Sequence, residues 1–151
     1  MASAPPTGRP VTVRCPLCGV LNRVDFDRLN AKPKCASCGR PLLLDRPLKV
    51  TDADFERVIQ SSSVPVLVDF YADWCGPCRV MAPVLDEFAR DRTGQVLVLK
   101  HDTDAEPETP RRLGIRGIPT LVVFRGGRED RRHVGAADLE TLEALVGSEP
   151  R

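Results

Sequence analysis

The sequence predicts an α/β sandwich domain preceded by a small module built around cysteines. Three observations lead to this fold class. Aliphatic, β-branched segments alternate with segments of helical periodicity after residue 47. Two Cys-x2-Cys pairs lie before them, within residues 15–38. Nine Lys/Arg and three Asp/Glu give residues 1–50 a charge of +6, whereas thirteen and eighteen give residues 51–151 a charge of −5, so we expect two differently built units.

The composition excludes several classes of protein. The 151 residues suffice for one domain of about 100 residues plus a small satellite. No apolar run approaches the roughly 20 residues that cross a bilayer, and residues 1–6 lack the charged and apolar regions of a signal peptide. The basic unit has one aromatic residue, Phe26, and so offers no platform for stacking nucleic-acid bases. We expect a monomeric cytosolic protein that binds neither membrane nor nucleic acid.

The first unit predicts a zinc site. Residues 1–10, with three prolines and a glycine, are expected to be a disordered leader, and the module covers residues 11–46. Its cysteines form two knuckles, at residues 15–19 and 35–39, with sixteen residues from Gly19 to Lys34 between them. Each knuckle can turn two sulfurs toward one tetrahedral ion. The predicted ligands are Cys15, Cys18, Cys35 and Cys38.

Size and charge agree with a metal in this module. It has too few apolar residues to fold alone, and four thiolates around one Zn²⁺ carry a net charge of about −2. Nearby basic residues can offset this charge, namely Arg14, Lys32, Lys34 and Arg40. The alternatives are unrelated reduced thiols and a redox switch that releases zinc on oxidation. Residues 42–44, three leucines, predict a returning strand, which residues 45–47 break at the domain boundary.

The second unit, residues 47–151, predicts alternating strands and helices. Strands are expected at residues 48–50, 66–70, 96–100, 120–124 and, as a polar edge strand after the Gly126-Gly127 turn, 128–134. Helices are expected from Thr51 or Asp52 to the serines at 61–63, and at residues 75–92, 107–113 and 139–146. This alternation is typical of an α/β sandwich.

The strand at residues 66–70 runs into Trp74-Cys75-Gly76-Pro77-Cys78, where the next helix begins. A thiol at a helix start faces unpaired backbone N–H groups and the positive end of the helix dipole, which lower its pKa and favour the thiolate. We therefore expect Cys75 to be exposed and to attack disulfides. Cys78, one turn into the helix, would resolve the mixed disulfide.

A carboxylate accompanies this cysteine pair. Asp69 lies within an otherwise apolar strand, so burial should raise its pKa and let it exchange a proton with Cys78 near neutral pH. The alternative is a solvated acid on an alternating strand. The cysteine pair itself could instead be half of a metal site completed by His101 and His133, but we expect both histidines to be solvent-exposed and without a catalytic role.

These residues closely resemble the thioredoxin family. Residues 74–78 follow a strand carrying Val68-Asp69-Phe70, Pro83 lies in the next helix, and Gly117-Ile118-Pro119-Thr120 precedes another strand. The resemblance covers residues 48–147, and the four-cysteine module narrows it to zinc-binding bacterial thioredoxins of the thioredoxin two or thioredoxin C type. It implies a thioredoxin-like three-layer sandwich with a mixed central sheet. It also implies a protein-disulfide reductase without an organic cofactor, recharged by NADPH-dependent thioredoxin reductase and acting on disulfide-containing client proteins.

The resemblance assigns further site residues. It implies that Asp69 transfers a proton, that Lys100 approaches Asp69, and that Gly76 and Pro77 complete the catalytic motif. It also implies that Ile118-Pro119 is a cis-proline loop whose Ile118 backbone pairs with the substrate chain, although a trans turn is the alternative. The implied docking surface consists of Trp74, Gly76, Pro77, Ile118, Pro119, Gly135 and Ala136.

Other functions compete with the reductase. A zinc-dependent interaction module, or a redox-controlled holdase on the same scaffold, would work through the four-cysteine unit and is the main alternative. A third possibility is that the same cysteine couple oxidises dithiols or isomerises disulfides. Gly76-Pro77 resembles the reducing members of the family, whereas oxidising relatives carry a histidine there, so the reductase is the predicted function.

Overall fold

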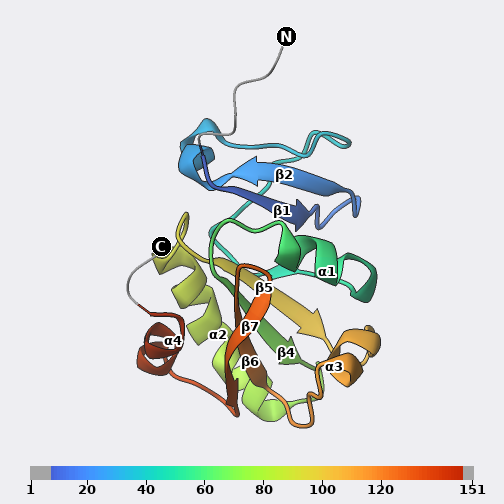
Figure 1. Ribbon diagram of the computed structural model, residues 1–151, viewed down its shortest axis with the longest axis vertical. Helices are drawn as coiled ribbons and strands as arrows, with labels where there is room; N and C mark the ends of the chain where they lie inside the picture. The colour runs from blue at the N-terminus through green and yellow to red at the C-terminus, as the bar shows by residue number, and fades with distance from the viewer. Residues whose placement is uncertain (1–7, 148–151) are drawn as a thin grey trace.

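The computed structural model describes residues 8–147, which form two β-sheets and the helices around them (Figure 1). The strands are β1 (Pro10–Arg14), β2 (Leu21–Asp25), β3 (Leu48–Lys49), β4 (Val66–Tyr71), β5 (Leu97–Asp102), β6 (Thr120–Arg125) and β7 (Arg128–Val134). The helices are the 3-10 helix η1 (Phe26–Ala31) and the α-helices α1 (Asp52–Gln60), α2 (Gly76–Asp91), α3 (Glu108–Arg112) and α4 (Leu139–Val146). Within residues 8–147, none of the helices combines the length and apolarity that crossing a membrane requires.

The larger sheet is mixed, with β4 at its centre. Its strand order is β3-β5-β4-β6-β7, and β4 runs parallel to β5 but antiparallel to β6. All six residues of β4 are buried, which explains why its sequence is apolar except for Asp69 and the terminal Tyr71. In contrast, β7 lies at the edge beside β6, and its side chains are exposed or half-exposed, as expected for a polar edge strand.

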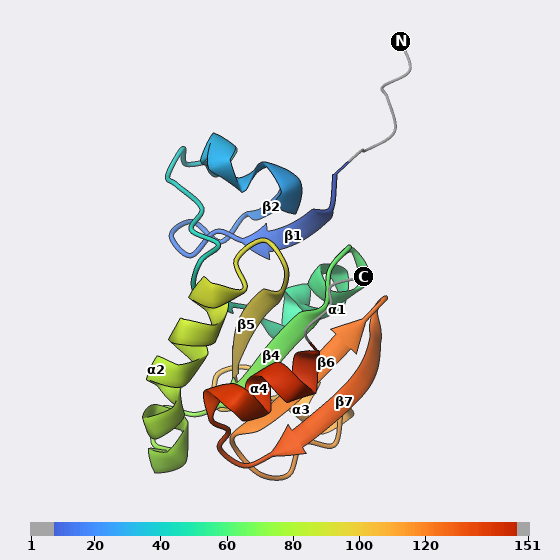
Figure 2. The same cartoon turned by 90° about the vertical axis from the view of Figure 1, so that its left-hand side faces the viewer.

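Helices cover both faces of this sheet, so the predicted three-layer sandwich is confirmed (Figure 2). Phe55 of α1 packs on one face in the same cluster as Val68. On the other face, Leu85 of α2 and Leu142 of α4 pack in the cluster that contains Leu67. Neighbouring residues of β4 are buried in different cores, because successive side chains of a strand point to opposite faces of the sheet.

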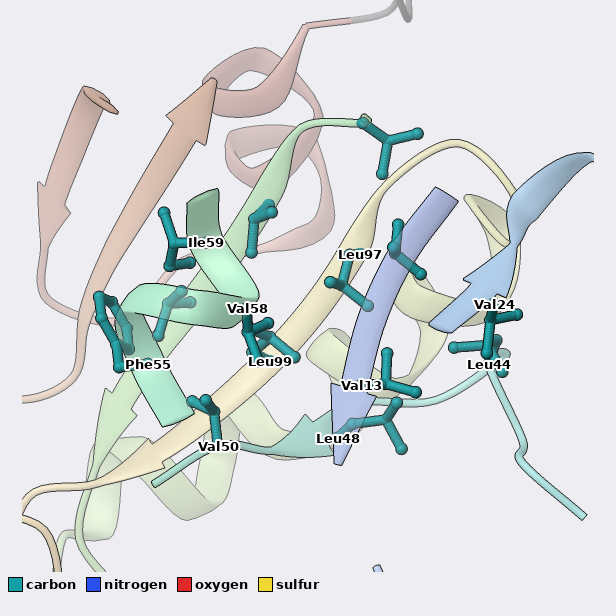
Figure 3. Packing of buried hydrophobic residues seen from close by; sticks show 14 of the residues in the cluster. Val13, Val24, Leu44, Leu48, Val50, Phe55, Val58, Ile59, Leu97 and Leu99 are labelled. Atoms are coloured by element: carbon teal, nitrogen blue, oxygen red, sulfur yellow. The ribbon is translucent and has the colours of Figure 1, made fainter. Parts of the chain in front are cut away.

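The cysteine-containing module packs onto the sandwich and shares one of its two cores (Figure 3). Its antiparallel hairpin of β1 and β2 lies beside α1. Val13 and Leu44 of the module are buried in the same cluster as Leu48 and Val58 of the sandwich. A module too small to fold alone therefore gains apolar burial from its neighbour.

Polar contacts cross the same interface. Arg14 of β1 forms an ion pair of 2.8 Å with Asp54 of α1. The Ser61 hydroxyl, at the end of α1, donates a hydrogen bond of 3.0 Å to Thr12 Oγ1. In both views the module lies near the C-terminal end of α2, whereas the N-terminus of α2 lies at the other end of the molecule (Figures 1 and 2).

The predicted strand at residues 42–44 does not form. In the described chain this segment belongs to no strand, and only an isolated bridge joins Lys34 to Pro41. Leu42 and Leu44 are buried, whereas Leu43 is 46% exposed. The prediction was wrong because alternating burial of an extended segment requires packing against a core, not pairing with another strand.

The predicted domain limits stay predictions. Strand β1 begins at Pro10, so the last residue of the expected leader belongs to the hairpin. Residues 1–7 of that leader lie outside the described residues.

Candidate active site and candidate metal centre

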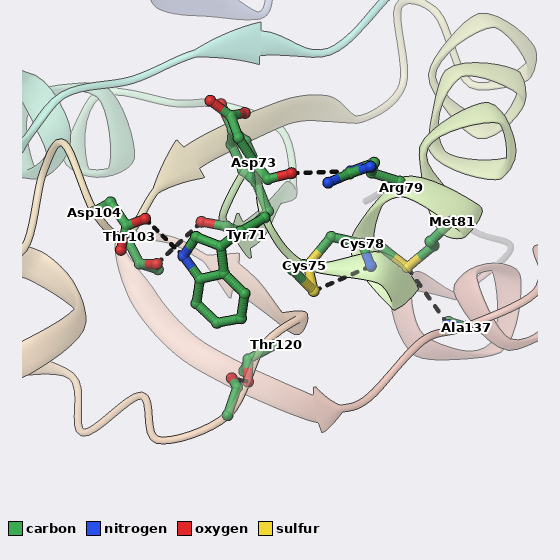
Figure 4. The surroundings of a disulfide bond; sticks show 12 residues. Tyr71, Asp73, Cys75, Cys78, Arg79, Met81, Thr103, Asp104, Thr120 and Ala137 are labelled. Carbon is green, nitrogen blue, oxygen red and sulfur yellow. Dashed lines mark hydrogen bonds between the residues drawn. A yellow bond between two sulfur atoms is a disulfide. The ribbon is translucent and has the colours of Figure 1, made fainter.

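Cys75 and Cys78 form a disulfide at the start of α2 (Figure 4). Cys75 is the N-cap of the helix, and its Sγ accepts a hydrogen bond of 3.2 Å from the backbone N–H of Cys78. The two Cα atoms are 5.3 Å apart, within the range of ordinary disulfides. Gly76 and Pro77 open the helix, where a backbone N–H has no acceptor within the helix, so the N–H that proline lacks is not missed. Both sulfurs therefore lie where the helix dipole stabilises a thiolate once the pair is reduced.

Cys75 is buried, so the expected exposure of this cysteine was wrong. Its exposed fraction is 3%, and that of Cys78 is 5%. The pair belongs to a small apolar cluster with Tyr71 and Ala72, against which Ile118 packs from a distant loop. Position at a helix tip does not guarantee exposure, because a remote segment can cover the tip. Access to the sulfurs therefore depends on the surface that surrounds them.

Asp69 is buried in β4, with an exposed fraction of 2%. Its Oδ1 atom has no hydrogen-bond partner in the described part of the chain. Burial raises the pKa of this carboxyl group to about 7, and the positive charge of Lys100 opposes that rise. Asp69 and Cys78 line the same cavity of about 300 Å³. A carboxyl group that titrates near neutral pH thus lies beside the cavity that also reaches the inner cysteine.

Lys100 lies beside Asp69 in the register of β4 and β5 and lines the same cavity. Its Nζ atom is 4.5 Å from the centroid of the Tyr71 ring, a distance suited to a cation–π interaction. The structure therefore brings the predicted lysine near the predicted carboxylate. Its charge partly offsets the effect of burial on the pKa of Asp69.

An exposed indole flanks the disulfide. Trp74 is 66% exposed, and its Nε1 donates a hydrogen bond of 2.7 Å to Asp104 Oδ2 (Figure 4). The carboxylate belongs to the turn after β5, so two distant segments meet at the indole. No sequence pattern marks Asp104, because a single aspartate in a polar turn is not distinctive.

The Ile118–Pro119 loop completes this surface. Its peptide bond is cis, as the resemblance implies. The backbone N–H of Gly135 donates to the Pro119 carbonyl at 2.8 Å, which places residues 134–136 beside the loop. Ala136 and Val134 are exposed there, and Val134 was not predicted as part of the surface. The predicted docking residues thus come together around the cysteine pair.

The four remaining cysteines converge at one point of the module. Their Sγ atoms all lie within 4.8 Å of one another, with Cys15 and Cys38 separated by 3.7 Å and Cys18 and Cys35 by 3.5 Å. A tetrahedral ion with Zn–S bonds of about 2.3 Å needs sulfurs about 3.8 Å apart. The donor set and its spacing therefore fit a single zinc ion.

Matching turns aim these sulfurs. In each knuckle a glycine with positive φ donates its N–H to the carbonyl of the first cysteine, at 2.9 Å in both Gly19 and Gly39. Such φ values suit glycine, which has no Cβ. Asn22, a buried residue that no sequence signal marked, accepts the N–H of Ala36 at 2.9 Å. The pKa of Cys35 is lowered to about 6, which favours its thiolate. The largest cause is a hydrogen bond from the backbone of Cys38, and the next is a hydrogen bond from the Asn22 side chain.

The two histidines take no part in either cysteine site, but the expected exposure of His101 was wrong. His101 is fully buried on β5, whereas His133 is half-exposed on β7. The ring of His101 packs 5.1 Å from that of Phe70 and 5.7 Å from that of Phe55, measured between centroids. A polar residue in a strand can be buried when its ring nitrogen finds a partner, and here Nε2 donates to the Glu106 carbonyl at 2.9 Å.

Comparisons with known proteins divide the chain in the same way. The family model described as "Thioredoxin" matches residues 46–148, and the zinc-ribbon model described as "Thioredoxin 2, N-terminal" matches residues 14–40. A thioredoxin of Allochromatium vinosum is 48% identical over 104 residues, which are 69% of this chain and 97% of that protein. A thioredoxin of Alicyclobacillus acidocaldarius is 50% identical over 99 residues, 66% of this chain and 93% of that protein.

Proposed function

Because the chain belongs to the thioredoxin family, we propose that it reduces protein disulfides with the Cys75–Cys78 couple and carries a structural zinc ion in its N-terminal module. The chain is a thiol-disulfide oxidoreductase. One observation carries the proposed mechanism: the buried Asp69 carboxyl group, with a pKa near 7, lines the same cavity as Cys78.

The first step needs a nucleophile at the helix N-terminus. In the reduced form, the Cys75 thiolate attacks one sulfur of a client disulfide, and the other client sulfur leaves as a thiolate that takes a proton. A mixed disulfide then joins Cys75 to the client. The N-cap position supports this role because the helix dipole and the N–H of Cys78 stabilise the thiolate.

The second step needs a base for the inner thiol. Cys78 gives its proton to the ionised Asp69 and attacks Cys75 Sγ, so the Cys75–Cys78 disulfide forms and the second client thiolate leaves. Two electrons have moved from the dithiol to the client. A base with a pKa near 7 suits this transfer, because it can be ionised to accept the proton and can later return it.

The surface around the disulfide supports substrate docking. Trp74, next to Cys75, and Val134, next to the Gly135 that bonds to Pro119, both expose apolar area. We assign the Ile118 backbone to pairing with the client chain and the surrounding residues to apolar contact. Gly76, which has open space beside it, lets the client approach the helix start. Lys100 contributes by tuning the pKa of Asp69.

The four-cysteine cluster is assigned to holding zinc for stability. All four thiolates would serve as ligands, leaving no open position for substrate, which is the arrangement of a structural site. Two charge-neutralising features suit this assignment: Arg14 donates to the Gly19 carbonyl of the first knuckle at 3.3 Å, and Lys32 and Lys34 are exposed on the module. The proposed setting is a reducing compartment such as the cytosol, with NADPH-dependent thioredoxin reductase as the electron donor.

Insulin reduction coupled to NADPH and thioredoxin reductase tests this function. The wild type should precipitate insulin and consume NADPH. Cys78→Ser should instead accumulate a mixed disulfide with insulin, visible on a non-reducing gel and cleaved by dithiothreitol, because the attack remains possible but the resolution does not. If Cys78→Ser traps no client, or if the wild type is inactive as a reductase but oxidises reduced peptides, the proposed direction and cysteine roles are wrong.

A further inference from the structure

His101 is a buried group that the proposed mechanism does not use. Its ring is fully buried between Phe55 and Phe70. Because Nε2 faces the Glu106 carbonyl oxygen at 2.9 Å, that nitrogen carries the proton and donates it. The other ring nitrogen, Nδ1, has no partner within the described residues. An apolar side chain would fill this place without a polar atom to satisfy, so the histidine calls for a reason beyond packing.

The partners of His101 are the groups that hold the turn after β5. Glu106 is fixed twice, by Nε2 of His101 at its carbonyl and by the backbone N–H of Asp52, which donates to Glu106 Oε1 at 2.7 Å. Asp52 in turn accepts the N–H groups of Glu108 and Thr109, the first residues of α3, at 2.9 and 2.8 Å. Nε2 of His101 also lies 3.3 Å from Asp52 Oδ1, so the ring nitrogen ties the end of this turn to the starts of α1 and α3.

The same turn holds the exposed indole beside the disulfide. Asp104 lies two residues before Glu106 and accepts the Nε1 proton of Trp74 at 2.7 Å. Asp102 Oδ1 caps the turn from inside by accepting the Asp104 N–H at 2.9 Å. A continuous path of hydrogen bonds and backbone thus leads from the buried imidazole to Trp74, next to Cys75.

We propose that His101 is a positioning residue: its Nε2–H fixes the turn at residues 102–107 so that Asp104 holds Trp74 in the orientation that docks client disulfides. This inference rests on the proposed docking role of Trp74. It predicts that loss of the imidazole donor weakens substrate docking while leaving the cysteine chemistry unchanged, because no reacting atom touches His101.

A double-mutant cycle on insulin reduction tests this coupling. His101→Leu keeps the apolar packing and removes the donor, and it should raise KM about fivefold, the effect of one lost hydrogen bond, with kcat nearly unchanged. Asp104→Ala should raise KM similarly, and the double variant should be no worse than Asp104→Ala alone. His101→Gln, which offers a donor of comparable reach, should restore KM. Full additivity of the two substitutions would overturn the proposal.

A second readout does not depend on activity. Trp74 is the single tryptophan of the chain, so its time-resolved fluorescence anisotropy reports the freedom of this indole alone. The indole should become more mobile in His101→Leu but not in Val58→Ala, a control that removes volume from the buried cluster of Phe55 and Phe70 and lies outside the turn at residues 102–107. Unchanged mobility in His101→Leu would refute the positioning role. If Trp74→Ala leaves KM unchanged, the proposed docking role fails, while the anisotropy still decides whether His101 restrains the indole.

Discussion

The two cysteine centres of this protein use the same Cys-x2-Cys spacing for different chemistry. In the sandwich, Cys75 and Cys78 open a long helix, which directs one sulfur of the pair back to the other. In the module, Cys15 and Cys35 begin short turns that end in glycines of positive φ. These turns aim both sulfurs of each knuckle outward at a shared point. The local backbone that follows the second cysteine therefore decides whether the pair closes on itself or meets a second pair.

The two centres also differ in what surrounds them. The redox pair has a buried carboxyl group near it and exposed apolar residues around it, which suits the proposed exchange of electrons and protons. The four-cysteine cluster has basic side chains nearby and shares a core with the sandwich, so it is equipped to stabilise. The comparison teaches that a reactive thiol needs a proton acceptor and an entrance, whereas a structural thiol needs a complete ligand set.

Replacing one cysteine in each centre should give the largest effects on turnover and on zinc content. Cys75→Ser should reduce insulin-reducing activity by at least about 1,000-fold, because no other thiol is placed to replace the nucleophile, and it should leave one zinc per chain. Cys18→Ser should do the reverse, losing zinc and keeping most of the turnover number. Insulin turbidity and metal analysis measure both. Retention of zinc in Cys18→Ser, or loss of turnover while the variant is still folded, would contradict this separation of roles.

Removing the metal should have the next largest effect. A strong chelator, or serine at all four module cysteines, should lower the free energy of unfolding by at least about 3 kcal/mol, because metal binding supplies folding energy and the module shares a core with the sandwich. Urea denaturation followed by circular dichroism measures this loss. The four-serine variant should retain reductase activity wherever it is folded. An isolated protein that contains no zinc and is unaffected by the substitutions would contradict the metal assignment.

Asp69→Asn should make the oxidised protein more stable at pH 8 and slower in turnover. The unfolded carboxyl group ionises near pH 3.8 and the folded one near pH 7, so the native state holds an extra proton between these values and the wild type loses stability as pH rises through them. A pKa raised from 3.8 to about 7 corresponds to a loss of at most about 4 kcal/mol in the free energy of unfolding. This loss is complete above pH 7 and absent below about pH 4. Turnover should fall about tenfold.

Urea denaturation of both proteins at several pH values checks the sign. Equal pH dependence of stability in wild type and Asp69→Asn would show that Asp69 is not the buried titrating group. Equal pH–rate profiles would remove it from the proton transfer.

The smallest effect should come from the ion pair that joins the two units. Arg14 and Asp54 are partly exposed, at 35% and 16% for their side chains, so their coupling should be only about 1 kcal/mol. Thermal unfolding of Arg14→Met, Asp54→Asn and the double variant measures it as a cycle. Zinc content should be unchanged in all three. A coupling near zero would leave the shared apolar core as the main link between module and sandwich.

Local patterns predicted most elements and both cysteine centres. The helix periodicity after Cys75, the apolar run of β4 and the glycine turn before β7 gave these elements within a residue or two of their observed ends. The repeated knuckle spacing predicted that the four module cysteines converge, because a few consecutive dihedral angles turn the two sulfurs of each knuckle to one side. The mixed central sheet came from the family resemblance, and the position of β4 at its centre was not predicted, since strand order depends on contacts between distant segments.

The sequence by itself determined which residues could react and which could bind metal, because spacing and local conformation set those properties. Only the tertiary structure decided what covers them. Ile118 reaches Cys75 from another part of the chain, and the rings of Phe55 and Phe70 enclose His101, so both residues are buried where exposure was expected. It also decided that a buried imidazole, a turn and an exposed indole form one continuous path. Burial and such paths arise from packing between segments far apart in sequence, which no local pattern encodes.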